Sequence, residues 1–98
     1  MSPERTTAYR RVLDTLAELG PSNMIRAHEE EQIRYAADSL ILCADLRQDE
    51  TTRDSLEDAE LLCEVLVESE RWERATADRL IQDLRACGPE LPVELQAA

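Results

Sequence analysis

Glycine and proline are scarce in this chain, and the few present stand near its ends. Among 98 residues the only glycines are Gly20 and Gly88, and the four prolines fall at positions 3, 21, 89 and 92. Residues 22–87 therefore contain neither. A strand-rich domain needs a turn about every 8–12 residues, and Gly and Pro supply most such turns. Their absence excludes a strand-rich fold and predicts an all-α protein.

Positive charge is also in short supply. The chain has 11 basic residues, all of them arginine, against 22 acidic ones, which gives a net charge of −11. Lys and Arg drive binding to nucleic acid and to anionic membranes, so we expect neither as a partner. The exclusive use of arginine is typical of a GC-rich genome and favours a bacterial source.

Long apolar runs are missing as well. No stretch approaches the roughly 18 apolar residues that indicate a membrane span. The longest run covers only residues 40–44. The first residues lack the basic start and the apolar middle of a signal peptide. We therefore expect a cytoplasmic protein that does not enter a membrane.

Residues that carry out chemistry are few. The three cysteines are spaced 20 and 24 residues apart with no Cys-x-x-Cys pair, which fits small buried side chains better than disulfides or a zinc site. The single histidine, His28, has Glu29 and Glu31 nearby, but a lone histidine near a helix start is more often a packed side chain. No glycine-rich elbow is present to build a nucleophile and an oxyanion hole. We predict no enzyme activity, no catalytic residue, no metal and no cofactor.

Apolar residues recur at spacings of three and four, the period of an amphipathic helix. Ser2 with Pro3 is a helix-start signal and Gly20 with Pro21 is a stop signal, so the first helix is predicted over residues 3–19. The remaining helices are expected from residue 23 or 24 to about 46, from 54 to about 68, and from about 70 to 87.

The connections between these helices are short, so we predict a small antiparallel bundle of about four helices in one domain, residues 1–88. A turn is expected at residues 47–53, and Thr51, Thr52 or Asp54 can cap the helix that follows it. No Gly or Pro separates the last two helices, so one continuous helix over residues 54–87 is the alternative. Residues 89–98 are expected to form a tail that lies extended against the bundle or is frayed.

Residues 49–70 hold most of the net charge. They contain nine acidic residues and one arginine, and so carry −8 of the chain's −11. Four of them, Glu57, Glu60, Glu64 and Glu68, stack along one flank of the predicted helix at spacings of three and four. Because like charges repel one another, we interpret the segment as a surface that meets a cationic partner or keeps the protein soluble.

Leu61 and Val65 point away from the predicted core on the far side of that flank, and Ile41 points away from the core face of its own helix. Exposed apolar side chains that group together can mark an interface. We therefore expect a non-enzymatic interaction or regulatory module that binds a basic protein through the four glutamates and these three apolar residues. Self-association as a homodimer is its simplest form. An acidic mimic of nucleic acid that blocks a basic partner is an alternative.

A second alternative follows from a short motif. Residues 54–63 read Asp-Ser-Leu-Glu-Asp-Ala-Glu-Leu-Leu-Cys, which resembles the start of the acidic second helix of acyl carrier proteins. The resemblance implies a phosphopantetheine on Ser55. Another Asp-Ser-Leu, at residues 38–40, stands at the family's spacing from the end of the first helix and implies Ser39 instead. Both copies lack the Gly that usually precedes the motif, and residues 22–46 read as a helix where the family has a long loop.

Overall fold

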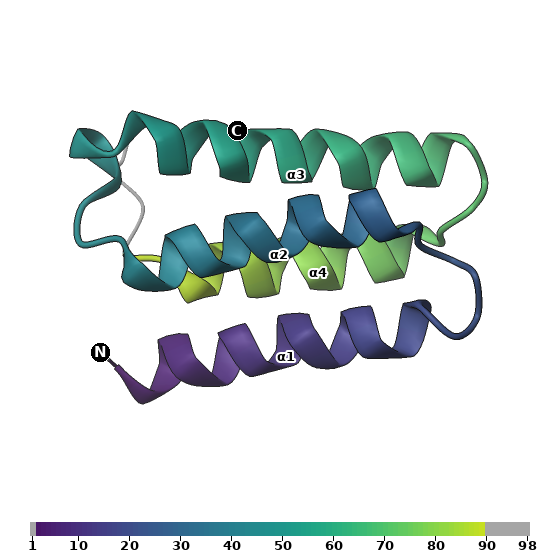
Figure 1. The fold of residues 1–98 in the computed structure, drawn as a ribbon, viewed down its shortest axis with the longest axis horizontal. Helices are drawn as coiled ribbons and strands as arrows, with labels where there is room; N and C mark the ends of the chain where they lie inside the picture. Colours follow the sequence, from purple (N-terminus) through teal and green to yellow (C-terminus); the bar gives the residue numbers. More distant parts are fainter. Residues whose placement is uncertain (1, 90–98) are drawn as a thin grey trace.

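The computed structural model describes residues 2–89 and confirms the prediction of an all-α bundle. Within them lie the helices α1 (Pro3–Leu19), α2 (Ala27–Leu42), α3 (Glu50–Glu68) and α4 (Arg74–Cys87), with a 3₁₀ turn, η1 (Leu46–Gln48), between α2 and α3. The four helices run side by side (Figure 1). α1 and α3 lie at diagonal positions of the bundle and are not in contact with each other. α2 and α4 form the other diagonal pair, and these two helices are in contact.

No helix in residues 2–89 is long and apolar enough to cross a membrane. Of the tail predicted at residues 89–98, all but the first residue lies outside the part of the chain that the structure describes.

The bounds of α1 are those that its sequence predicts. The Ser2 hydroxyl accepts a hydrogen bond from the backbone N–H of Arg5 at 3.3 Å, and Pro3 occupies the first helical position. Pro fits there because its missing N–H would have no partner in any helix. The start signals in the sequence therefore act as expected.

The predicted start of the second helix at residue 23 or 24 is wrong. Asn23 adopts a left-handed backbone conformation, with φ of 57°, and the chain turns so that the Met24 N–H donates to the Leu19 carbonyl at 3.1 Å. α2 begins after Arg26, whose backbone N–H donates to the Glu29 carboxylate at 2.8 Å. The acidic residue three positions into the helix, rather than Ser or Asn before it, fixes the start.

The predicted boundary between the second and third helices is also wrong. α2 ends at Leu42 instead of about residue 46, and α3 begins at Glu50 instead of residue 54. The Asp49 carboxylate accepts a hydrogen bond from the Thr52 N–H at 3.0 Å and so caps α3 within the stretch predicted to be a turn. Four of the seven residues of the expected turn, 50–53, therefore belong to α3.

The choice between one long helix and two is settled in favour of two. α3 ends in a Schellman motif, in which Glu70 takes the left-handed conformation with φ of 64°. The Glu70 N–H donates to the Val67 carbonyl and the Arg71 N–H to the Leu66 carbonyl, each at 3.0 Å. The chain then turns back and starts α4 at Arg74.

Side chains from all four helices fill one core. Its largest fully buried members come from every helix and from η1: Leu16, Ile33, Leu40, Leu46, Leu66, Leu80 and Leu84. The three cysteines are buried in it as free thiols, as the sequence predicts. Burial raises the pKa of Cys63 and of Cys87 to about 12, so these thiols are inert near neutral pH.

One arginine ties three helix ends together at one end of the bundle. Arg5 of α1 donates from Nη2 to the carbonyls of Leu40 and Cys43, at 2.7 and 2.9 Å, and from Nε to the carbonyl of Cys87 at 2.8 Å. These carbonyls lie at the ends of α2 and α4, where no further helical turn follows. The Leu40 carbonyl also accepts a hydrogen bond from the Cys43 N–H at 3.1 Å. A cation there also offsets the negative ends of both helix dipoles.

A second arginine, Arg71, joins two loops at the opposite end of the bundle. Arg71 binds the buried Glu29 with two hydrogen bonds of 2.8 and 2.9 Å. The Met24 carbonyl accepts a hydrogen bond from the indole N–H of the buried Trp72 at 2.7 Å. The Arg71 guanidinium, with the N–H of Arg26, holds the pKa of the Glu29 carboxyl below its usual value despite burial. The loops before α2 and before α4 are thereby fixed to each other.

Candidate partner-binding surface

The acidic flank predicted on α3 divides into two parts. Glu60 forms an ion pair with Arg85, and Glu64 binds Arg74 with two hydrogen bonds of 2.8 Å, so both are tied to α4. The Arg74 guanidinium lowers the pKa of the Glu64 carboxyl. Glu57 and Glu68 are exposed, and within residues 2–89 they have no ion-pair partner.

Two further carboxylates, Asp54 and Asp58, are exposed on α3 in the same way and without a salt bridge to any described residue. They flank Leu61 and Val65, each of which is 57% exposed. We refer to these residues together as the acidic outer face of α3: Asp54, Glu57, Asp58, Leu61, Val65 and Glu68.

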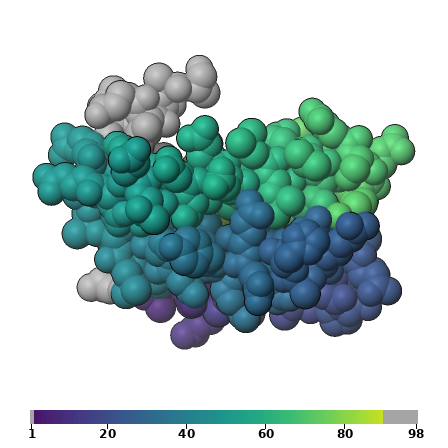
Figure 2. Space-filling view, turned by 45° about the horizontal axis from the view of Figure 1, so that its top comes forward, coloured from purple at the N-terminus to yellow at the C-terminus, as the bar shows by residue number. Residues whose placement is uncertain are grey.

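α2 lies beside this face. The Gln32 side chain of α2 donates to the Asp58 backbone carbonyl of α3 at 3.2 Å, and Figure 2 shows α2 and α3 running next to each other across one side of the molecule. Tyr35 and Leu42 of α2 are 56% and 80% exposed. They stand within about 80° of Gln32 around the helix, given 100° per residue, so they flank the outer face of α3.

The structure does not bring Ile41 to this surface. Ile41 follows Gln32 by nine residues, which places it about 180° around α2. Because Gln32 faces α3, Ile41 lies on the side of α2 that faces away from α3, and it is only half-exposed. Tyr35 and Leu42, and not Ile41, are the large exposed apolar residues of α2.

The helical period of the sequence predicts the exposure of Leu61 and Val65 on α3, but not that of Tyr35 and Leu42 on α2. The sequence predicts that this helix continues to about residue 46, which places Leu42 inside it and not at its end. The shorter α2 leaves Leu42 at its last position, where nothing covers it.

The two serines of the carrier-like motif lie inside helices. Ser55 is in the second turn of α3, where its hydroxyl donates to the Thr51 carbonyl at 3.0 Å. Ser39 is half-buried within α2. The motif of acyl carrier proteins places its serine at the start of a helix, and neither serine here has that position.

The remaining candidate for chemistry, His28, is exposed in the first turn of α2. Its neighbour Glu29 turns inward and binds Arg71, so this carboxylate does not orient the imidazole. Residues 2–89 contain no group of three or more His, Cys, Asp or Glu side chains that could hold a metal ion.

Comparisons with known proteins give no family for this chain: it matches no protein-family model, no characterised protein and no solved structure. The arrangement of its own residues is therefore the basis for a functional proposal.

Proposed function

We propose that this protein is a non-enzymatic interaction module that binds a basic protein through the acidic outer face of α3. The observation that carries the proposal is that one exposed helix face combines Leu61 and Val65 with carboxylates that have no ion-pair partner within residues 2–89. Partner surfaces with complementary charge speed association and exclude wrong partners, and the apolar side chains add contact area.

The division of the flank supports this proposal. Glu60 and Glu64 already have arginine partners in α4 and stabilise the fold. The carboxylates of the outer face have none among the described residues, so they can bind a cationic group of another molecule. An amphipathic helix with Lys or Arg around a short apolar stripe has the complementary pattern.

The negative charge of the outer face of α3 favours another protein as its partner over a second copy of this one. A symmetric homodimer through the outer face of α3 would set carboxylates against carboxylates, because the same patch meets itself in such a dimer. Each copy also carries a net charge of −11. We therefore prefer a basic partner to the homodimer that the sequence suggested.

The test uses a helical Leu/Lys peptide as probe and two variants that remove the same charge. Glu57→Gln with Glu68→Gln changes the outer face, whereas Glu4→Gln with Asp14→Asn changes exposed carboxylates of α1, which is not in contact with α3. By calorimetry we expect the first pair to weaken peptide binding about tenfold. The second pair should have little effect. Equal weakening would show that only net charge attracts the peptide and would overturn the proposal.

A second measurement separates the basic partner from self-association. Sedimentation velocity of the purified protein should show a monomer at low and at high salt. A dimer that Leu61→Glu and Val65→Glu disrupt would show that the face binds another copy, and would contradict the preference for a basic partner.

A further inference from the structure

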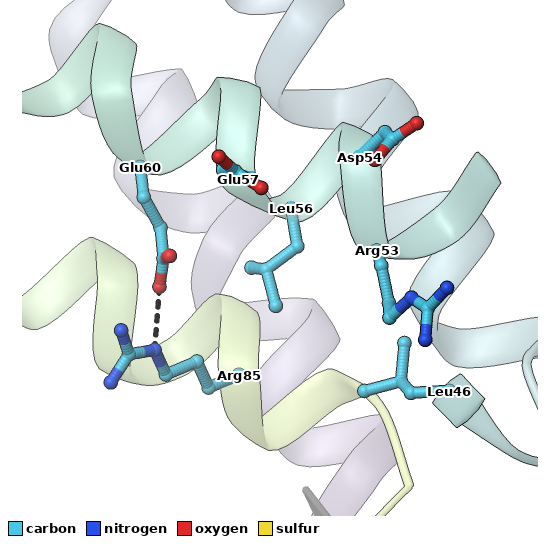
Figure 3. Close-up of a pocket in the computed structure, with 7 residues that line it drawn as sticks. All are labelled: Leu46, Arg53, Asp54, Leu56, Glu57, Glu60 and Arg85. Carbon is cyan, nitrogen blue, oxygen red and sulfur yellow. Dashed lines mark hydrogen bonds and ion pairs between the residues drawn. The ribbon is translucent and has the colours of Figure 1, made fainter. Parts of the chain in front are cut away.

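Next to the outer face of α3 the surface is hollowed by a pocket of about 340 Å³. Three elements form it (Figure 3): η1 contributes Leu46, α4 contributes Arg85, and α3 contributes Arg53, Asp54, Leu56, Glu57 and Glu60. Glu57 belongs both to this pocket and to the outer face, so the two are continuous.

The floor of the pocket is apolar. Leu46 and Leu56 are almost fully buried, with 1% and 8% exposure. Figure 3 shows the Leu56 side chain pointing from α3 into the hollow, with Leu46 at one end of it. Such a floor suits a hydrocarbon chain.

Only some of the charged side chains that line the pocket have an ion-pair partner within residues 2–89. Arg85 at one side is bound to Glu60, so these two charges neutralise each other. Arg53 at the other side donates to the Arg47 carbonyl at 3.5 Å. Glu57 and Asp54, which also lines the pocket, have no salt bridge within residues 2–89. Three carboxylates and two guanidiniums leave the lining with a net negative charge.

An apolar floor below an acidic rim fits one kind of guest: a flexible hydrocarbon chain that ends in a cation. Lysine and arginine side chains have this composition, since their stems pack on apolar surface while the charged head stays at the rim. The volume accommodates one such side chain. We infer that the pocket anchors a lysine or arginine side chain of the basic partner, with its stem on Leu46 and Leu56 and its head at Glu57.

This inference rests on the proposed function but is tested separately from it. The probe is N-acetylarginine amide, added to the protein with its leucine methyl groups isotope-labelled for NMR. We expect shifts concentrated at the Leu46 and Leu56 methyls, and none of comparable size with N-acetylnorleucine amide, which has the stem without the charge. Shifts with N-acetylglutamate amide alone would show that Arg53 and Arg85 bind an anion, and would overturn the inference.

Two variants of equal charge refine the test. Glu57 and Glu68 are eleven residues apart and so share a face of α3, but only Glu57 lines the pocket. Glu57→Gln should weaken binding of the arginine probe about tenfold, and Glu68→Gln should leave it unchanged. Equal effects of the two variants on the small probe would contradict an anchor at Glu57. If the arginine probe fails while the Leu/Lys peptide still depends on both glutamates, the pocket inference falls and the proposed function stands.

Discussion

A single glycine near the end of α4 is required for steric reasons rather than for its backbone freedom. Gly88 has an extended conformation, with φ of −88°, that any residue can adopt. A Cβ atom at this position would lie 2.8 Å from Cδ2 of Leu40, which is fully buried. The sequence identifies Gly88 as a helix stop, but the close contact with α2 explains why no larger residue fits.

We predict that Gly88→Ala lowers the free energy of unfolding by about 1–2 kcal/mol, because the added methyl group overpacks the core. Gly20→Ala is the control. A Cβ there would be 3.6 Å from the Leu16 carbonyl oxygen, the nearest atom outside the adjoining residues. The helical backbone at this position favours Ala over Gly, but Pro21 disfavours that conformation for a preceding residue with a Cβ atom, so the change in stability should stay below about 0.5 kcal/mol. Urea unfolding of both variants measures the difference. A neutral Gly88→Ala would show that Leu40 moves aside at no cost.

A second residue-scale prediction concerns the buried carboxylate of Asp83, which is 8% exposed in α4. Burial raises its pKa although Arg11 and Arg79 act in the opposite direction. A raised pKa in the folded state means that the protonated form favours folding. This stabilisation is complete below the ordinary value of 3.8 and is lost as the pH rises through the folded-state pKa.

Asp83→Asn should therefore raise the free energy of unfolding near pH 7, by on the order of 1 kcal/mol, because it removes a poorly solvated charge. The gain should shrink as the pH falls and disappear at the pH where wild-type Asp83 is protonated. Urea midpoints between about pH 4 and pH 8 test this. Asp14→Asn, at an exposed position, should show no such trend. A loss of stability at pH 7 would mean that the attraction of Arg11 and Arg79 exceeds the cost of burial.

At the scale of the helices, the break between α3 and α4 depends on a residue poorly suited to it. Glu70 holds the left-handed conformation that closes the Schellman motif, a position where Gly is usual. An L-residue with a Cβ atom in this conformation costs roughly 1 kcal/mol.

We predict that Glu70→Gly stabilises the protein by about 0.5–1 kcal/mol, since glycine adopts this conformation without strain. Glu70→Gln keeps the strain but removes the charge, so it separates the two contributions. Thermal unfolding of the two variants gives the comparison. If the glutamine variant gains as much as the glycine variant, repulsion among the carboxylates rather than backbone strain is the cost at this position.

The elements that the sequence predicts well are those whose signals are local. α1 follows from Ser2 and Gly20 at its ends. The break between α3 and α4 contains no Gly or Pro, and for this reason the sequence leaves one helix or two as alternatives there. The ends of α2 depend in part on partners far away in the chain: Arg71 orients the Glu29 that caps its start, and Arg5 binds the carbonyls where α2 ends. A local sequence pattern does not indicate contacts between residues so far apart in the chain.

The same distinction applies to the candidate surface. The exposure of Leu61 and Val65 follows from the helical period, and the structure confirms it. The helical period does not indicate which glutamates form ion pairs. This depends on which of them face Arg74 and Arg85 of α4. The pocket joins three elements, so its lining could not be assembled from the sequence.

At the scale of the whole molecule, the distribution of charge has two opposing effects on how stability changes with salt. Ion pairs such as Glu64 with Arg74 hold α3 to α4 and weaken as salt is added. Repulsion within the segment that carries −8 of the net −11 also weakens with salt, and its relief stabilises the fold. The carboxylates of the outer face of α3 are exposed and within residues 2–89 lack ion-pair partners, so repulsion should dominate.

We therefore predict that the free energy of unfolding increases when NaCl is raised from about 0.1 M to about 1 M, as the Debye length falls from about 10 Å to about 3 Å. Urea is the denaturant for this measurement because guanidinium would itself act as a salt. The variant carrying Glu57→Gln and Glu68→Gln should start from a higher stability at low salt and gain less from the added salt. The α1 control, with Glu4→Gln and Asp14→Asn, should keep the wild-type dependence because its charges lie away from the acidic segment. A stability that falls with salt would show that the ion pairs outweigh the repulsion, and that the outer face of α3 carries its charge without a cost to the fold.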